Sequence, residues 1–224
     1  MKPTIAIVSK SEKIDKQVLE SINFAEEIVI VVDSPINPPQ IAGKIHRYYH
    51  PLADDYASQR NYALKNAHHN WVLFIDDDEY VGTELAREIQ KLNPNTKFSG
   101  FLVKRIDGCF HQPLLHGETG NTRLLRLAKR SSGEFVRPVH ETWKIDGGVG
   151  ELLSPLYHIK DNFISGFTDR MSHYSKIDAD ALLKENKPFS FFRFFLNPKA
   201  KFIQNYFGKL GFLDGTVGLF WHIL

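Results

Sequence analysis

Four consecutive acidic residues, Asp76, Asp77, Asp78 and Glu79, directly follow the apolar run 71–75. Their charges repel one another, and this repulsion raises the pKa of the carboxyl groups unless a cation is present. Mg²⁺ and Mn²⁺ take oxygen ligands and commonly share them with the phosphates of a substrate. In an extended segment, Asp76 and Asp78 point to one side and Asp77 to the other. The spacing therefore favours a divalent cation at Asp76 and Asp78 over a solvated turn.

The elements that must position these acids alternate between short apolar runs and amphipathic segments. Strands are predicted at 4–8, 27–33 and 71–75, a proline-rich loop at 34–40, and helices at 14–22, 55–67 and 82–92. The last helix is predicted to have Thr83 as its N-cap. This alternation indicates an α/β fold with a mostly parallel central sheet and helices on both faces.

Polar residues also follow the first two predicted strands. Ser9 and Lys10 come after the first strand, and Asp33 ends the second. Ligands of such sheets bind beyond the carboxyl ends of the strands. We therefore expect these residues to converge with the acidic cluster on one crevice.

In the second half of the chain, predicted strands and helices no longer alternate. Strands are predicted at 100–107 and 122–129, and one long helix, or two with a break, at 162–186. We expect an α/β domain over 1–160 and a C-terminal helical extension over 161–224.

Composition limits where the protein acts and what it binds. The net charge of +2 is too small to suggest nucleic-acid binding, and a single cysteine, Cys109, excludes an intrachain disulfide and fits a reducing cytoplasm. The N-terminal apolar run is too short for a signal peptide. No run approaches the ~18 uncharged apolar residues of a membrane span. These features favour a cytoplasmic protein.

The tail, residues 187–224, is rich in aromatic and basic side chains. It holds nine of the 17 phenylalanines and several lysines and arginines against one acid, Asp214. Such a segment can cap the core, because phenylalanine clusters are usually buried. It can equally lie on the inner face of a membrane, with aromatic side chains at the acyl boundary and basic ones at anionic headgroups.

Several blocks resemble family 2 glycosyltransferases, which have the GT-A fold. They include "EEIVIVVDS", "ASQRNYALKNAHHNWVLFIDDDEYV" and "RLLRLAKRSSGEFVRPVHETW", and the match runs from about residue 4 to residue 183. Within that family, the chain is similar to the small bacterial enzymes of lipopolysaccharide-core and polysaccharide synthesis described as β-1,4-glucosyltransferases. The resemblance implies a GT-A domain with a C-terminal helical, aromatic and basic appendage.

The resemblance also implies roles around the donor. Asp76 and Asp78 match the D-x-D motif, which holds Mg²⁺ or Mn²⁺ on the donor diphosphate, and Asp77 stands where the family usually has a small residue. Asp33 matches the acid that contacts the nucleoside. Ser9 and Lys10 match the loop beside the base and ribose.

Further residues match the donor border and the catalytic region. The segment Gln59, Arg60 and Asn61 matches the helix that borders the donor. Glu141 aligns with the catalytic acid region and is the candidate general base; the alternative is a surface strand residue paired with Arg137.

Among the histidines, His158 matches one that recurs in the family. It can complete the metal shell or contact the diphosphate, or be a hydrogen-bonded core histidine. His140 is expected to be structural or acceptor-facing, and His111 and His116 to shape the acceptor side. One of Arg123 and Arg126 is expected to meet a phosphate.

The implied reaction is an inverting, metal-dependent transfer of a hexose such as glucose. The expected donor is a nucleotide-diphosphate sugar, with a UDP-sugar as the first candidate, and the expected acceptor is a glycan or a lipid-linked molecule. Two alternatives stay open. One is a nucleotidyltransferase on a similar sheet, although the "VSKSEK" loop lacks the glycine that such enzymes usually have. The other is a non-catalytic, membrane-peripheral protein that binds nucleotide-sugars.

Overall fold

The computed structural model describes residues 1–224 except 36, 111, 139–140, 161–174, 176–189 and 224. Two compact units make up the described chain: Met1–Arg105 with Arg123–His158, and Ile106–Thr122 with Ile159–Leu224. The predicted helix at 162–186, apart from Ser175, lies outside the described residues, as do His111 and His140.

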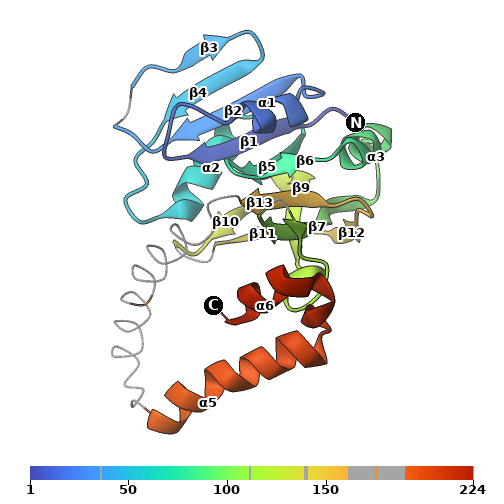
Figure 1. Ribbon diagram of the computed structural model, residues 1–224. Helices are drawn as coiled ribbons and strands as arrows, with labels where there is room; N and C mark the ends of the chain where they lie inside the picture. The colour runs from blue at the N-terminus through green and yellow to red at the C-terminus, as the bar shows by residue number, and fades with distance from the viewer. Residues whose placement is uncertain (36, 111, 139–140, 161–174, 176–189, 224) are drawn as a thin grey trace. The chain divides into compact units, whose positions relative to one another are not determined.

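The first unit is built on a sheet with the strand order β3-β4-β2-β1-β5-β9-β7 (Figure 1). The bounds are β1 (Thr4–Ser9), β2 (Glu27–Val32), β3 (Gln40–Ala42), β4 (Ile45–Tyr49), β5 (Trp71–Asp76), β7 (Phe98–Cys109) and β9 (Arg123–Lys129). The four strands β4, β2, β1 and β5 are parallel, whereas β3, β9 and β7 run antiparallel to their neighbours. The predicted α/β class is confirmed.

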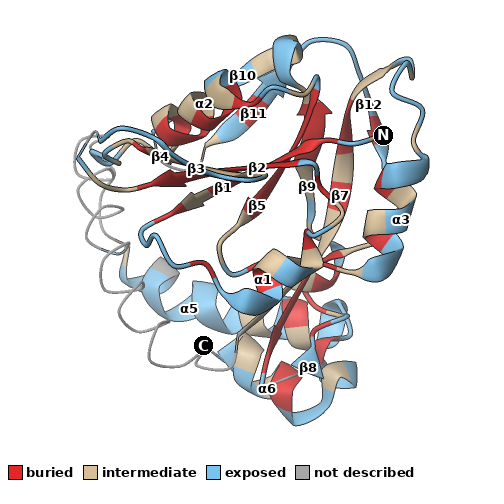
Figure 2. Cartoon of the chain, turned by 90° about the horizontal axis from the view of Figure 1, so that it is seen from above, coloured by how far each residue is buried: buried red, intermediate tan, exposed pale blue. Residues whose placement is uncertain are grey.

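Helices cover both faces of this sheet, as Figure 2 shows. α1 (Lys16–Ser21) and α3 (Thr83–Lys91) pack on the face that carries Ile5 and Ile7. α2 (Tyr56–Asn66) packs on the other face, with Ala6 and Val29, beside the hairpin of β10 (Gly133–Val136) and β11 (Thr142–Ile145). Because successive strand residues point to opposite faces, continuous apolar strands are required to fill both layers.

The predicted N-cap of α3 is wrong. Gly82 occupies that position without a side-chain hydrogen bond, and Thr83 is the first helical residue. A Cβ atom on residue 82 would lie 2.9 Å from ring carbon Cε2 of Tyr157. Close packing against this ring therefore favours glycine over a side chain that could cap the helix.

Short strands complete the first unit. β6 (Tyr80–Val81) follows the acidic cluster and pairs with β13 (Leu156–Lys160), and β12 (Gly148–Glu151) pairs with β7. Neither the β3–β4 hairpin nor these short strands were predicted from the sequence. β4 is half-buried at the margin of the sheet and has no continuous apolar run.

The second unit has a small core of its own. α6 (Gly215–Ile223) places Val217 against Cys109 and Leu114. β8 (Gln112–Pro113) pairs with the end of β7, and α5 (Phe191–Phe202) continues through η3 (Ile203–Gly208) and η4 (Gly211–Asp214) towards α6. The ring of His116 contacts Asp214 (Nδ1 to Oδ1, 2.7 Å), which ties the 112–117 loop to this tail.

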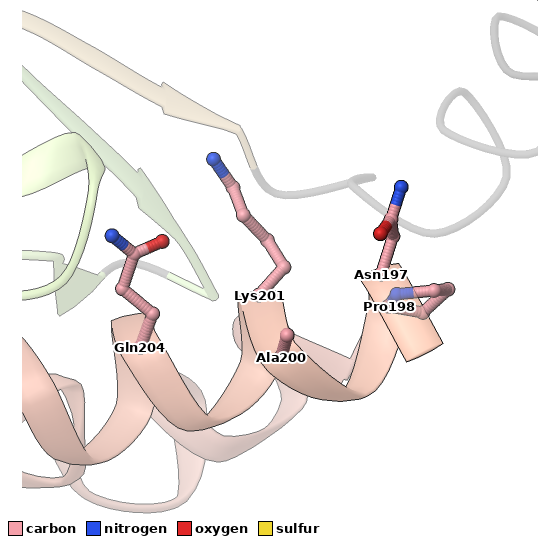
Figure 3. A pocket seen from close by; sticks show the side chains of 5 residues that line it. All are labelled: Asn197, Pro198, Ala200, Lys201 and Gln204. Carbon is pink, nitrogen blue, oxygen red and sulfur yellow. The ribbon is translucent and has the colours of Figure 1, made fainter. Parts of the chain in front are cut away.

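In contrast to α6, α5 is exposed along nearly its whole length. A cavity of about 710 Å³ is lined by the polar side chains of Asn197 and Lys201 from α5 and of Gln204 from η3, which project from one side of the helical segment (Figure 3). Lys201 is paired with Glu118 (2.8 Å). Among the described helices, none combines the length and apolarity needed to cross a membrane.

Candidate active site

The four acids after β5 form a turn. The backbone N–H of Glu79 donates to the carbonyl oxygen of Asp76 at 3.1 Å, so the chain reverses at Asp77 and Asp78. The expectation of an extended segment, with Asp76 and Asp78 on one side, is therefore wrong. The turn gives each acid a different environment.

Asp76 is held by two arginines. Arg60 Nη2 donates to Oδ1 at 2.9 Å, and Arg126 Nη2 donates to Oδ2 at 2.8 Å. Burial alone would raise the pKa of Asp76, but the charges of Arg126 and Arg60 outweigh it and hold that pKa well below its usual range. Asp76 is thus an anion balanced by protein cations.

Glu79 is fully buried beneath the turn. Its Oε2 accepts the backbone N–H of Asp76 (2.9 Å), and its Oε1 accepts Arg126 Nη2 (2.7 Å) and lies 3.6 Å from Arg105 Nη1. Burial raises the pKa of Glu79, and the charge of Arg126 offsets part of that rise. This acid therefore fixes the turn and does not face a ligand.

Asp77 joins the residues at the ends of β1 and β2. Ser9 Oγ donates to Asp77 Oδ2 at 2.6 Å, the backbone N–H of Asp33 donates to the Ser9 carbonyl at 2.8 Å, and Asp33 Oδ1 accepts the N–H of Leu52. Burial raises the pKa of Asp77, and the charges of Asp78 and Asp76 add to the rise. Ser9, Asp33 and Asp77 thus lie together at the strand ends, as expected, and their sharing of one ligand crevice with Lys10 stays a prediction. Lys10 follows Ser9 and is exposed.

Asp78 lies beside His158. Its Oδ1 is 3.3 Å from His158 Nε2, and its side chain is 43% exposed. One carboxylate and one imidazole suit a divalent cation that also binds substrate phosphates. Asp76 fits such a site less well, because both of its oxygens already accept arginine donors and its charge is balanced by Arg60 and Arg126. The donor set therefore favours Asp78 and His158 as the protein ligands.

Glu141 lies next to the acid turn although 65 residues separate it from Asp76 in the chain. Arg60 Nε donates to Glu141 Oε1 at 2.8 Å while its Nη2 binds Asp76, so one guanidinium joins the two carboxylates. The Arg60 carbon Cζ lies 5.7 Å from the ring centre of Phe74 and 5.5 Å from that of Phe135. The alternative pairing of Glu141 with Arg137 is wrong.

The neighbours of Arg60 on α2 have positioning contacts. Gln59 is buried and donates its amide to the His50 carbonyl (2.8 Å). Asn61 donates to the carbonyl of Phe135 (2.9 Å) and accepts its N–H (2.8 Å), which attaches β10 to α2. A contact of Gln59 or Asn61 with the donor stays a prediction.

A cavity of about 570 Å³ opens between these groups. Its lining includes Arg60, Asp76 and Glu141, Phe135 and Trp143 of the β10–β11 hairpin, and side chains of β7 and β9, among them Arg105, Arg123 and Arg126. Sequence reasoning missed Arg105, Phe135 and Trp143. Arg105 stands in a stretch with no motif of its own, whereas Phe135 and Trp143 lie within the block 123–143 but are of residue types that usually fill a core.

One group of described residues can hold a metal ion by its arrangement: Glu27, His46 and His68, whose ligand atoms all lie within 4.8 Å of one another. This group stands where β2 and β4 begin, at the opposite edge of the sheet from Asp76. Glu27 already accepts hydrogen bonds from Thr4 and from the backbone of His68 (2.9 Å). The cluster is therefore separate from the acid turn.

No protein-family model matches the chain. Curated proteins do match over most of its length. It is 26% identical to the lipopolysaccharide core biosynthesis glycosyltransferase LpsC of Rhizobium meliloti over 89% of this chain and 81% of that protein. It is 27% identical to the uncharacterized glycosyltransferase RC0292 of Rickettsia conorii over 96% of this chain and 84% of that protein. The resemblance to glycosyltransferases is confirmed.

A third relative, the uncharacterized glycosyltransferase RT0209 of Rickettsia typhi, is 26% identical over 74% of this chain and 63% of that protein. Among solved structures, residues 1–349 of S. aureus TarS match 48% of this chain and 36% of that chain, with 22% identity and a TM-score of 0.39. The same TarS fragment has been solved in complex with UDP, with 24% identity and a TM-score of 0.37.

Proposed function

We propose that the chain is an inverting glycosyltransferase that moves a hexose from a nucleotide-diphosphate sugar, such as UDP-glucose, to a glycan or lipid-linked acceptor. The observation that carries this proposal is the Arg60 bridge, which joins Asp76 to the Glu141 carboxylate at the wall of a cavity. LpsC, named for lipopolysaccharide core biosynthesis, supports an acceptor of the cell envelope.

In the proposed reaction, the residues at the ends of β1, β2 and β5 bind the donor. Asp33, Ser9 and Lys10 surround the nucleoside, and Asp77 adds a hydrogen-bond acceptor beside them. Asp78 and His158 would hold the cation, Mg²⁺ or Mn²⁺, that neutralises the leaving diphosphate. These roles divide the donor among three neighbouring strand ends.

Glu141 is the proposed general base. It takes the proton from the attacking hydroxyl of the acceptor, while Arg60 keeps its carboxylate in place. One displacement inverts the configuration at the anomeric carbon, so a single base suffices. The hairpin that carries Phe135 and Trp143 shields this side of the site from water.

We further propose that α5 binds the inner face of the membrane. Phe191, Phe192 and Phe194 are 67%, 76% and 61% exposed, a cluster that a soluble surface rarely carries. Lys199 and Lys201 lie on the same helix and can meet anionic headgroups. A lipid-linked acceptor would then reach the enzyme at the membrane surface.

Two variants separate donor binding from chemistry. Thermal shifts with a panel of nucleotide-sugars, with and without Mn²⁺, should identify a stabilising donor. The Asp78→Ala variant should lose the part of that thermal shift that depends on Mn²⁺. Glu141→Gln keeps an oxygen for Arg60 but not the basicity. It should bind donor normally and lower turnover with core oligosaccharide acceptors by roughly 10²-fold or more.

Other outcomes point elsewhere. Near-normal turnover of Glu141→Gln would remove Glu141 as the base. Release of pyrophosphate from a nucleoside triphosphate and a sugar phosphate would indicate the nucleotidyltransferase. Donor binding without turnover across the acceptor panel would indicate the non-catalytic binding protein.

A further inference from the structure

The cavity beside Glu141 is unusually rich in arginine for its size. Arg60, Arg105, Arg123 and Arg126 line it, together with two acids, Asp76 and Glu141. The two acids are already engaged, since Asp76 binds Arg60 and Arg126, and Glu141 binds Arg60. The buried Glu79 also binds Arg126 and lies 3.6 Å from Arg105. The carboxylates at the cavity are therefore balanced, and the arginine side chains of its lining are the cationic donors that a ligand would meet.

The most buried of these guanidinium groups include N–H donors without a hydrogen-bond partner among the described residues, namely Arg60 Nη1 and Arg126 Nε. Both residues are less than one-tenth exposed, at 9% and 7%. Trp143, which also lines the cavity, has the same kind of donor at Nε1. Buried donors are rarely left unpaired in native proteins, so these groups mark the cavity wall as a place with unused hydrogen-bonding capacity.

The two more exposed arginines of the cavity differ in their partners: Arg123 has an exposed one, and Arg105 lies 3.6 Å from the buried Glu79. Arg123 contacts Glu151 through Nε at 3.2 Å, and the two side chains are 42% and 56% exposed. Exposed pairs of this kind contribute little, so a ligand can exchange the contact at low cost. Arg105 reaches the cavity from β7, beside β9. A carboxylate or phosphate would match the planar fork of either guanidinium.

The strand order indicates which substrate occupies the cavity. Asp33, Ser9 and Asp78 follow β2, β1 and β5, which places the proposed donor site on one side of β5. The cavity lies towards β9 and β7, on the other side, and is lined by Glu141. A general base contacts the acceptor hydroxyl, so the group next to it belongs to the acceptor.

We propose that this cavity binds a carboxylate or phosphate group of the acceptor sugar, and that Arg105 and Arg123 select for that anion. The inference rests on the proposed function, because it assigns the cavity to the acceptor of a sugar transfer. Phe135 and Trp143, stacked with ring centres 4.9 Å apart, form an apolar wall against which the ring of the acceptor can lie.

The test compares acceptors that differ in one anionic group. The first pair is a phosphorylated core oligosaccharide and the same molecule after phosphatase treatment. The second pair is an oligosaccharide that carries a carboxyl group and the same molecule after reduction of that group. Calorimetry in the presence of nucleoside diphosphate measures binding without turnover. The wild type should prefer one anionic form by about tenfold or more, and Arg123→Gln should remove most of that preference. The acceptor pair that shows the preference identifies the bound group as a phosphate or a carboxylate.

Two matched variants and the donor complete the design. Arg123→Lys should retain part of the preference, because it keeps the charge but loses the fork. Lys144→Gln removes an exposed charge of β11 outside the cavity and should change nothing. Donor affinity should be the same in all variants, since the donor binds on the other side of β5.

Equal binding of the charged and neutral acceptors by the wild type would overturn the inference. So would an Arg123→Gln variant that loses the same affinity for the charged acceptor as for the neutral one. Failure of the proposed function looks different. In that case the anionic oligosaccharide binds with the expected preference, but no sugar is transferred to it.

Discussion

The buried arginine in β9 provides the sharpest test of how the acid turn is held together. Arg126 is 7% exposed and binds both Asp76 and Glu79. Arg126→Met leaves Glu79, which has no exposed surface, with Arg105 at 3.6 Å as its described ion-pair partner. Removing one member of a buried ion pair costs about 3–5 kcal/mol. For a chain of this size, the melting temperature should fall by roughly 6–20 °C.

Urea denaturation near neutral pH measures this loss, and the same strand supplies the control. Arg123→Met removes an exposed partner of Glu151 and should cost less than about 1 kcal/mol. Adding Glu79→Gln to Arg126→Met should recover part of the loss, because the stranded charge is gone. If Arg126→Met costs no more than Arg123→Met, or if the double variant recovers nothing, the buried-charge explanation is wrong.

The pH dependence of the Arg126→Met deficit has a defined sign. Burial already raises the pKa of Glu79, and losing Arg126 removes the charge that offsets this rise. The carboxyl group therefore takes up a proton in the folded state as the pH falls, and it then no longer needs a cation. The deficit should shrink towards acid pH in melting curves recorded at several pH values.

Two other expectations concern the turn and the tail. Asp77→Asn should stabilise the protein at neutral pH, because burial raises the pKa of Asp77 and its ionised form costs stability; melting curves should show the gain disappearing below about pH 3.9, where folded and unfolded chains are both protonated. Replacing Phe191 and Phe192 by serine should weaken sedimentation with anionic vesicles by roughly tenfold or more, with little change in melting temperature, because both side chains are exposed. Unchanged vesicle binding would contradict the membrane role of α5.

The parallel half of the fold could be predicted because its strands are apolar on both faces. β1, β2 and β5 are buried almost throughout, since helices cover both sides of the sheet, and this produces uninterrupted apolar runs in the sequence. β4 also pairs in parallel, yet it reads Ile-His-Arg-Tyr-Tyr and is mostly half-buried. A strand near the margin of the sheet lacks the continuous apolar run that identifies its neighbours.

The site could be predicted in part for a similar reason. Parallel strands end at one edge, so the approach of Ser9, Asp33 and Asp77 follows from their places in the sequence. The ion pairs do not follow, because Arg60 and Arg126 are 16 and 50 residues from Asp76 and reach it from other elements. Arg60 and Arg126 are among the candidate site residues of the sequence, but no local pattern pairs either of them with Asp76.

The turn formed by residues 76–79 accommodates four neighbouring acidic side chains. Reversal of the chain after Asp76 gives each of the four carboxylates a different environment, and arginines balance Asp76 and Glu79. Asp77 then accepts a hydrogen bond from Ser9, and Asp78 remains at the surface next to His158. A divalent cation arriving with a diphosphate would meet Asp78 next to His158, whereas both oxygens of Asp76 already accept arginine donors. The two arginines on Asp76 are why we expect Asp78, more than Asp76, to be the direct ligand.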